Sequence, residues 1–471
     1  MPATQHTPDV KIFGKKFFNT VLADQLPFLR HKFRPLVRMF LRRRILRYSL
    51  NTAFFLLMPW VSFAQLTQTV ALPVDLPNVL TMTNDHRIHS LGQWRKRRKE
   101  LLRLFTSQMY GQMPPRPKAM RFLVVDNTPN ALGEIASRMQ VTVLLNGNVN
   151  GPSLHLLLYV PNQVLKRGKR APVIVGLNFW GNETVNADPG ILISKRWVES
   201  EKNPWVDLSC VQDHRATAAC RGINASQWPL QAILKRGYAL ATVYRGDVDR
   251  DTKDGYTHSL RAYYPKLQQR ADNFSTIGAW AWALSRILDY LETDPNVDAK
   301  KVVVFGWSRL GKAALWAGAT DPRFAMVISN ESGAGGAKLF RRDVGETILD
   351  LNTNFPYWFC NNFKQYNGHD ATLPFDQHMV LAMIAPRPLY IASAIDNHGA
   401  DPEGEFLAAV AADPVYRLLG TSGLPTKQWP PVNHPVAGQI GYHVRSGGHN
   451  VTSYDWTQFL NFADMHLKSA H

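Results

Sequence analysis

The stretch that most constrains the fold of this chain is a short apolar strand that runs directly into a turn and then a helix. It reads Val302-Val303-Val304-Phe305-Gly306-Trp307-Ser308-Arg309-Leu310-Gly311-Lys312. The β-branched run predicts a strand, and the Ala- and Leu-rich segment 311–319 predicts a helix. A serine at such a sharp joint is held in a strained conformation, with its hydroxyl at the carboxyl end of the sheet. We therefore predict that Ser308 is a nucleophile.

The residues around this serine suit the same role. Gly306 permits the tight turn, whereas Leu310 stands where a Gly-x-Ser-x-Gly pattern has its second glycine and Gly311 follows one place later. The N-terminus of the following helix would offer backbone N–H groups and a favourable dipole to a developing oxyanion. The alternative is a helix-capping serine at an ordinary strand–helix joint.

Further strand and helix patterns surround this joint. Helical periodicity is found at 277–292, and a last helix is expected around 456–467. The other predicted strands are 139–145, 154–160, 172–177, 239–244, 326–329 and 389–394. Strands that alternate with helices predict parallel βαβ units. We expect an α/β fold with three layers, in which helices flank a mostly parallel central sheet. Residues 65–471 are expected to form a single catalytic domain.

A histidine near the C-terminus is the best candidate for the base. In hydrolases with this type of joint the order along the chain is Ser, acid, His. His449 lies in the glycine-bearing loop Ser446-Gly447-Gly448-His449-Asn450, just before the last helix. Glu331 follows one predicted strand, and Asp396 and Asp401 follow the next. The spacing alone leaves the choice of acid open, because a surface carboxylate or a helix cap would look alike.

The N-terminal segment predicts export. Residues 1–64 contain eleven basic and two acidic residues, which is half of the net charge of +18. A basic region, an apolar run at 50–63 and small residues up to Ala64 are typical of a secretory signal peptide cleaved after Ala64. Initiation at Met39 instead of Met1 would give a signal of ordinary length. The apolar run is short for a membrane span, so no stable span is expected after cleavage. An uncleaved anchor is the alternative.

The charge that remains does not demand a nucleic-acid partner. The other half of the +18 is spread over 407 residues, an excess that would suit an anionic polysaccharide. The three cysteines are too few for a disulfide framework. Cys210 and Cys220 could close one loop, leaving Cys360 unpaired, or all three could be buried thiols.

At this point a set of motifs resembles a known family. The matching segments are Gly306-Trp307-Ser308-Arg309-Leu310-Gly311-Lys312, Asn330-Glu331-Ser332-Gly333, Arg341-Arg342-Asp343-Val344-Gly345-Glu346, Ala385-Pro386-Arg387-Pro388, Ala400-Asp401-Pro402-Glu403-Gly404-Glu405-Phe406 and Gly448-His449. Together they resemble the glucuronoyl esterases, carbohydrate esterase family fifteen, and the bacterial branch more than the fungal one. The resemblance implies the α/β-hydrolase fold.

The resemblance also implies an activity and a set of roles. Such enzymes hydrolyse the ester between 4-O-methylglucuronate on xylan and an alcohol, typically of lignin, with no metal or cofactor. By resemblance Ser308 is the nucleophile, His449 the base and Glu331 the acid. Arg309 would stabilise the oxyanion, and Lys312 and Glu346 would hold sugar hydroxyls. Alternatively, Glu346 could be a buried partner of Arg341 or Arg342.

Two positions depart from the family pattern Asp-x-Trp-Ala-Asp-Pro. Asn397 stands where relatives often carry a second acid, and Gly399 replaces the tryptophan. The first departure favours Glu331 as the acid, although Asp396 could substitute. The second removes a surface on which a sugar could stack.

The expected partner is glucuronoxylan or another uronate-containing polysaccharide ester, and a monomer is expected. An acetyl xylan esterase or another polysaccharide esterase is the alternative within the same chemistry. A secreted carbohydrate-binding protein that keeps the hydrolase fold without turnover is an alternative from another class. The presence of Ser308, Glu331 and His449 argues against it. We expect the protein in the periplasm or outside the cell.

Overall fold

The structure is a computed structural model that describes residues 75–200 and 204–468. The chain divides after Gln68, and the description below concerns the C-terminal unit, Thr69–His471, alone. The predicted signal peptide, its cleavage after Ala64 and the start at Met1 or Met39 lie outside the described residues.

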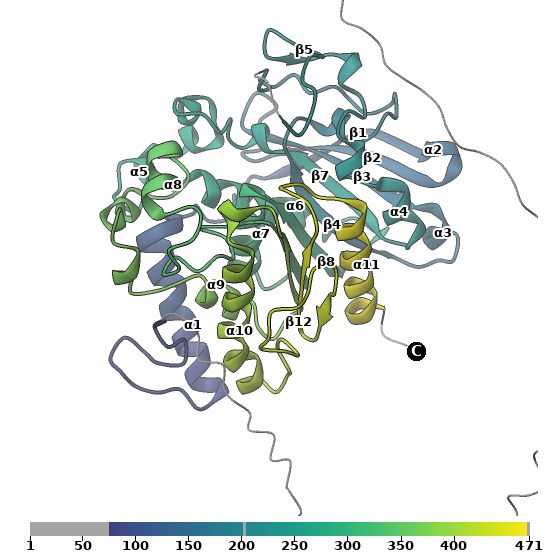
Figure 1. The fold of residues 1–471 in the computed structure, drawn as a ribbon. Coiled ribbons are helices and arrows are strands. Elements are labelled where there is room, and N and C mark those ends of the chain that lie inside the picture. Colours follow the sequence, from purple (N-terminus) through teal and green to yellow (C-terminus); the bar gives the residue numbers. More distant parts are fainter. Residues whose placement is uncertain (1–74, 201–203, 469–471) are drawn as a thin grey trace, which may run out of the picture. The chain divides into compact units, whose positions relative to one another are not determined.

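A ten-stranded sheet organises the C-terminal unit, in the order β1-β2-β3-β7-β4-β8-β9-β10-β12-β11 (Figure 1). Its strands are β1 (Arg121–Asn130), β2 (Ala136–Leu144), β3 (Ser153–Pro161), β4 (Ala171–Asn178), β7 (Ala239–Tyr244), β8 (Val297–Trp307), β9 (Met326–Asn330), β10 (Leu389–Ala394), β11 (Val436–Ala437) and β12 (Ile440–Arg445). The six neighbours from β7 to β12 are parallel. The strands at both edges of the sheet pair antiparallel. Each of the seven predicted strands lies in this sheet.

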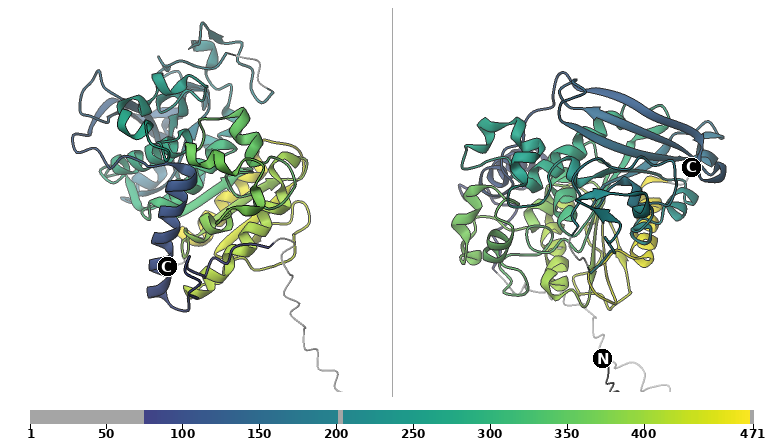
Figure 2. Two further views of the ribbon diagram at one scale, coloured as in Figure 1. Left: turned by 90° about the vertical axis from the view of Figure 1, so that its left-hand side faces the viewer. Right: turned by 90° about the horizontal axis from the view of Figure 1, so that it is seen from above.

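The antiparallel strands β1, β2 and β3 extend the sheet at one edge, as Figure 2 shows. A separate pair, β5 (Val211–Gln212) and β6 (Arg215–Ala216), lies in the long connection between β4 and β7. Cys210 and Cys220 form a disulfide in the same connection, whereas Cys360 is a buried free thiol. The first of the two interpretations of the cysteines is therefore the one observed.

Helices cover both faces of the sheet. They are α1 (Leu91–Phe105), α2 (Ala131–Glu134), α3 (Asn162–Leu165), α4 (Leu230–Lys235), α5 (Pro265–Gln268), α6 (Thr276–Leu291), α7 (Arg309–Thr320), α8 (Ile348–Asn354), α9 (His378–Ala382), α10 (Pro402–Leu418) and α11 (Ser453–Leu467). The helices predicted at 277–292, 311–319 and 456–467 correspond to α6, α7 and α11. The three-layer α/β-hydrolase architecture is confirmed.

Alternation along β8 explains why both faces need helices. Val302 and Val304 pack into the cluster that contains α1, α6, α7, α9 and α10. Val303 and Phe305 point the other way, into the cluster formed with α4 and α11. A parallel strand buried on both faces is apolar at every position, because each side chain meets a helix layer. Within the described residues, no helix is long and apolar enough to cross a membrane.

Candidate active site

Ser308 lies at the joint between β8 and α7 in a strained backbone conformation. Its φ is +56° and its ψ is −131°, a region that non-glycine residues rarely occupy. The backbone N–H of Ser308 donates to the carbonyl of Asn330 at 2.9 Å, and its own carbonyl accepts from Gly311 N at 2.8 Å. A side chain at Gly306 would meet the carbonyl oxygen of Leu310 at 2.1 Å, so the turn requires glycine there.

His449 and Glu331 meet at this joint in a chain of hydrogen bonds. His449 Nε2 lies 2.9 Å from Ser308 Oγ, and His449 Nδ1 lies 3.0 Å from Glu331 Oε2. Glu331 follows β9, the strand beside β8, and His449 lies in the loop after β12. The carboxyl ends of parallel strands share one edge of a sheet, and this topology brings together residues that are far apart in the sequence.

The carboxylate of Glu331 is buried and held at both oxygens. Oε1 accepts from Arg445 Nη2 at 2.6 Å and from the backbone N–H of Asn450 at 3.4 Å. Oε2 accepts from Asn397 Nδ2 at 2.9 Å in addition to its contact with His449. The orientation of the carboxylate is therefore fixed by donors on both sides.

The two other candidate acids lie elsewhere. Asp396 is exposed, although its backbone N–H donates to Gly447 O at 3.1 Å. Asp401 caps α10 and pairs with Arg342 at 2.8 Å. Among these three acids, Glu331 is the one in contact with His449 in the described part of the chain.

Arg445 and Asn397 are the residues of this site that sequence reasoning missed or undervalued. Arg445 is the last residue of β12 and also pairs with buried Asp455 at 2.9 Å. Asn397 Nδ2 lies 2.9 Å from His449 Nδ1 as well as from Glu331. The departure from the family pattern at Asn397 could have pointed to that residue, whereas no feature of the sequence around Arg445 indicates that it contacts the site.

Arg309 is the first residue of α7, and its guanidinium contacts residues that lie outside this helix. Nη1 donates to Asp251 Oδ2 at 2.6 Å. Its guanidinium carbon lies 4.8 Å from the ring centre of Trp358 and 5.2 Å from that of Phe355. Its backbone N–H belongs to the first turn of α7, where N–H groups have no acceptor within the helix. Both groups belong to the residue that follows Ser308 in the sequence.

Lys312 is buried, and its ammonium donates to the carbonyls of Ser332 at 2.7 Å and Ala334 at 2.5 Å. Burial lowers the pKa of Lys312 to about 8, so it is still largely protonated at neutral pH. Two of its three donors hold the loop after β9. One N–H of the Lys312 ammonium therefore remains for the contact with sugar hydroxyls that the resemblance predicts.

Glu346 is half-buried, and its backbone N–H donates to Gly399 O at 3.0 Å. The alternative in which Arg341 or Arg342 neutralises it is not what the described residues show. Arg341 faces Asp376 at 3.5 Å, and Arg342 pairs with Asp401 and Glu403.

Aromatic side chains surround the histidine. The ring centre of Trp307 lies 5.1 Å from that of His449, and that of Trp205 lies 5.3 Å away at a steep angle. Trp205 is 41% exposed. An aromatic surface is therefore present beside His449 although Gly399 lacks a ring.

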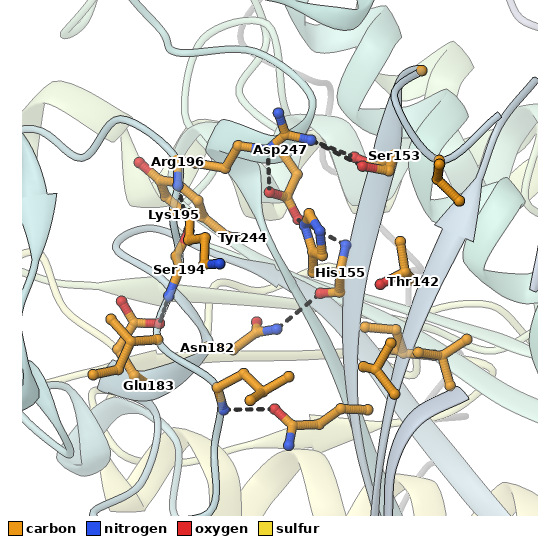
Figure 3. Close-up of a pocket in the computed structure, with 18 of the residues that line it drawn as sticks. Thr142, Ser153, His155, Asn182, Glu183, Ser194, Lys195, Arg196, Tyr244 and Asp247 are labelled. Carbon is orange, nitrogen blue, oxygen red and sulfur yellow. Dashed lines mark hydrogen bonds and ion pairs between the residues drawn. The ribbon is translucent and has the colours of Figure 1, made fainter. Parts of the chain in front are cut away.

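A cavity of about 540 Å³ is lined by residues of β2, β3 and the loop before Trp197 (Figure 3). His155 Nδ1 and Arg196 Nε lie 3.0 and 3.3 Å from the carboxylate of Asp247 in its wall. Burial raises the pKa of Glu183, also in the wall, to about 7. None of the predicted site residues lines this cavity, so it is not the place where they meet. Within the described residues, no group of three or more His, Cys, Asp and Glu side chains is arranged to hold a metal.

Comparisons with known proteins agree with this architecture. The family "Glucuronyl esterase, fungi" matches residues 213–420. "Carbohydrate esterase MZ0003", from an unknown prokaryotic organism, is 44% identical over 83% of this chain and 89% of its own length. A 4-O-methyl-glucuronoyl methylesterase from the fungus Wolfiporia cocos is 39% identical over 38% of this chain and 46% of its own length.

Solved structures give the same result. A promiscuous family 15 carbohydrate esterase from a marine bacterial metagenome is 44% identical, with a TM-score of 0.78 over 84% of this chain and 97% of its own. A glucuronoyl esterase from Solibacter usitatus is 41% identical, with a TM-score of 0.78 over 83% of this chain and 98% of its own. With these matches covering most of both chains, the protein belongs to carbohydrate esterase family 15, the glucuronoyl esterases.

Proposed function

We propose that the protein is a serine esterase that cleaves the ester between (4-O-methyl-)glucuronate on xylan and a lignin alcohol. The observation that carries the proposal is the chain of contacts from Ser308 Oγ through His449 to Glu331, at 2.9 and 3.0 Å. A nucleophile, a base and an orienting acid in this order are what acyl transfer requires. Membership of the glucuronoyl esterase family supports the uronate as the acyl group.

The first half of the reaction forms an acyl-enzyme. Ser308 Oγ attacks the ester carbonyl while His449 Nε2 takes the hydroxyl proton. The imidazolium that forms is stabilised by Glu331, whose two oxygens are held by Arg445, Asn397 and the Asn450 N–H. The tetrahedral oxyanion is stabilised by the backbone N–H and guanidinium of Arg309. Collapse of this tetrahedral intermediate completes the acyl-enzyme, because His449 returns its proton to the alcohol oxygen as the carbonyl re-forms, and the alcohol leaves.

The second half releases the uronate. His449 removes a proton from water, which attacks the acyl-enzyme, and then returns that proton to Ser308 Oγ as the bond between Oγ and the uronate carbonyl carbon breaks. The product carries a new carboxylate, so positive charge on Arg309 and Lys312 suits both the transition state and the product. Glu346 and the remaining donor of Lys312 are proposed to bind sugar hydroxyls.

Turnover of benzyl glucuronate by the wild type and by Ser308→Ala tests the nucleophile. We expect the variant to fold and to retain only a rate on the order of 10³–10⁴ over water. Exposed Ser446 offers a matched control, because Ser446→Ala should keep full activity and full labelling by a fluorophosphonate. A Ser308→Ala variant with near-normal turnover contradicts the mechanism.

A separate pair of variants tests which carboxylate is the acid of the triad. Glu331→Gln removes the charge beside His449 Nδ1, and we expect kcat to fall by about 10⁴-fold, as for loss of the charge of a triad acid. Asp396→Asn changes an exposed carboxylate and should change kcat little. The reverse result would make Asp396 the acid.

An acetylated xylan or sugar assayed beside benzyl glucuronate tests the acyl group. The marine relative is described as promiscuous, so some acetyl release is compatible with the proposal. Cleavage of acetyl groups alone would favour an acetyl xylan esterase. A wild type that is neither labelled at Ser308 nor active on either ester would favour a carbohydrate-binding protein.

We further propose a secreted monomer, periplasmic or extracellular, with residues 65–471 as one catalytic domain after cleavage at Ala64. The Cys210–Cys220 disulfide supports export, because disulfides persist in oxidising compartments. N-terminal sequencing of the protein recovered from the culture medium and the periplasm tests both the location and the cleavage position. A mature chain that retains residues 50–63 would favour the anchor.

A further inference from the structure

The guanidinium of Arg309 is fixed by residues that are remote in the sequence. Asp251 Oδ2 accepts from its Nη1 at 2.6 Å. Its guanidinium carbon lies over the rings of Trp358 and Phe355, at 4.8 and 5.2 Å. Those two rings stack on each other with centres 3.7 Å apart and planes 3° apart. A cation that lies beside a pair of stacked aromatic rings and donates to a buried carboxylate has little freedom to move.

Asp251 is itself firmly held. Its side chain is 1% exposed, and Oδ1 accepts from Trp358 Nε1 at 2.6 Å. Its backbone carbonyl accepts from the hydroxyl of Tyr357 at 2.7 Å. Its φ is +61°, a left-handed conformation that costs energy for any residue with a side chain. Such strain persists only where the surroundings determine the conformation, and it is often found at functional sites.

A second arginine shares the same carboxylate. Arg245, also buried, donates from Nη1 to Asp251 Oδ2. Burial alone would raise the pKa of Asp251, but the charges of Arg309 and Arg245 and the hydrogen bond from Trp358 lower it overall. Asp251 is therefore ionised at neutral pH, between two cations.

The charges of this cluster have a consequence for Arg309. A lone Arg309–Asp251 ion pair would be neutral and would offer little to a developing negative charge. Because Arg245 already compensates Asp251, the three groups together keep one positive charge. Glu199 lies 3.3 Å from Arg245, but its side chain is 36% exposed and its charge is screened by water. Of the two cations, Arg309, the residue after the proposed nucleophile, is the less buried.

We propose that Asp251 is the positioning residue for the Arg309 guanidinium, and that Arg245 neutralises Asp251 so that Arg309 acts on the oxyanion as an uncompensated cation. The inference rests on the proposed function, in which Ser308 is the nucleophile. An interaction made in the transition state and not in the ground state changes kcat more than KM. The cluster should therefore control kcat.

Asp251→Asn is the first test, because it keeps the shape and an oxygen to accept from Trp358 but removes the charge. Loss of one oxyanion donor costs about 10²–10³ in kcat, and loosening one should cost less. We expect kcat on benzyl glucuronate to fall by about 10- to 100-fold, with KM within about threefold. In the Arg309→Ala background the same substitution should change kcat by less than about twofold, because no guanidinium remains to be positioned.

Arg245→Gln tests the compensation of charge separately. It leaves the Arg309–Asp251 contact in place but makes that pair neutral, so kcat should fall although Arg309 keeps its anchor. Normal kcat in this variant would overturn the charge argument. Trp358→Phe removes the Nε1 donor to Asp251 and reduces the ring beside Arg309 while keeping an aromatic side chain there. It should lower kcat in the same direction by less, which keeps the test valid if Asp251→Asn does not fold.

Asp289→Asn is the matched control. Asp289 is a buried aspartate on α6 that pairs with Arg286 at 2.8 Å and with Arg323 at 2.7 Å. Its substitution should lower the unfolding temperature and leave the kcat of the folded enzyme unchanged. The positioning role is overturned if folded Asp251→Asn keeps wild-type kcat, or if its loss is equally large without Arg309. Absence of wild-type turnover would instead refute the proposed function.

Discussion

Gly306→Ala is the substitution that most directly tests how the turn presents Ser308, the proposed nucleophile. An added Cβ would lie 2.1 Å from the carbonyl oxygen of Leu310 and 2.7 Å from Gly311 N. Carbon and oxygen in contact lie about 3.3 Å apart, so the backbone of α7 must retreat by about 1.2 Å. Both close atoms belong to the backbone, so no rotation of a side chain relieves the clash.

That displacement sets the expected size of the effect. A misplacement of about 1 Å at a reacting group costs roughly 10²-fold in rate. Overpacking of this kind also costs about 1–3 kcal/mol of unfolding free energy. We therefore expect kcat/KM on benzyl glucuronate to fall at least about 100-fold in a protein that still folds at 25 °C.

Two other glycines provide the comparison. At Gly311 the nearest atoms to an added Cβ are side-chain atoms, Ser332 Cβ at 3.0 Å and Ser329 Oγ at 3.1 Å. The required shift is only about 0.5 Å, so Gly311→Ala should lose much less activity. A Cβ at Gly92 in α1 meets nothing within 4 Å, and Gly92→Ala should raise stability by up to about 1 kcal/mol with unchanged activity.

Rates of fluorophosphonate labelling, measured beside thermal unfolding, distinguish a displaced Ser308 from a partly unfolded protein. A displaced Ser308 reacts slowly in a fully folded sample. The reasoning is refuted if folded Gly306→Ala keeps its kcat/KM within about threefold of the wild type, because the clash would then have been relieved without moving the serine.

Three further predictions concern groups that support the site and the fold. Arg445→Met leaves Glu331 and Asp455 without their shared cation, so urea titration should show a loss of about 3–5 kcal/mol, and kcat should also fall; an unchanged urea midpoint would contradict this. Folded Glu183 binds its proton up to about pH 7, whereas the unfolded residue releases it near its ordinary pKa of 4.5. Wild-type stability should therefore fall as pH rises through that window, and Glu183→Gln should remove about 3 kcal/mol of this dependence between pH 4 and pH 8; parallel curves for the two proteins would refute it. Replacing Cys210 and Cys220, 10 residues apart, by serine should cost about 3 kcal/mol in the loop-entropy model, and an unfolding temperature indifferent to reductant would count against it.

The strands that could be predicted from the sequence are those that are buried on both faces. All six residues of β7 and of β10 are buried, and each reads as an apolar run. β1 was missed because it lies at the edge of the sheet, where Leu123 and Val124 are exposed and no clear alternation develops. β12 was missed for the opposite reason. It is fully buried but contains His443 and Arg445, whose side chains lie within hydrogen-bond distance of the carboxylate of Asp455 on α11.

The residues of the candidate site also differ in how well they could be predicted from the sequence. The position of Ser308 at a strand–helix joint could be predicted because the strand, the turn and the helix are continuous in the sequence. Arg445 and Asp251 could not, because their partners Glu331 and Arg309 are 114 and 58 residues away. A single sequence shows that a charged residue is present, but it does not show which buried charge faces it. The roles of these groups follow only from the fold.

The residue at position 397 determines whether Glu331 can keep its charge beside His449. Asn397 Nδ2 lies 2.9 Å from Glu331 Oε2, where an amide donates a hydrogen bond and an ionised carboxylate would repel. Two unit charges at that distance interact with roughly 6 kcal/mol at an effective dielectric constant of 20. An aspartate in the same place would therefore either be protonated or push Glu331 away from His449. If Glu331 is the acid, an amide at position 397 is the residue that keeps its charge directed at the imidazole. The missing second acid is then a consequence of which acid is used and not a defect of the site.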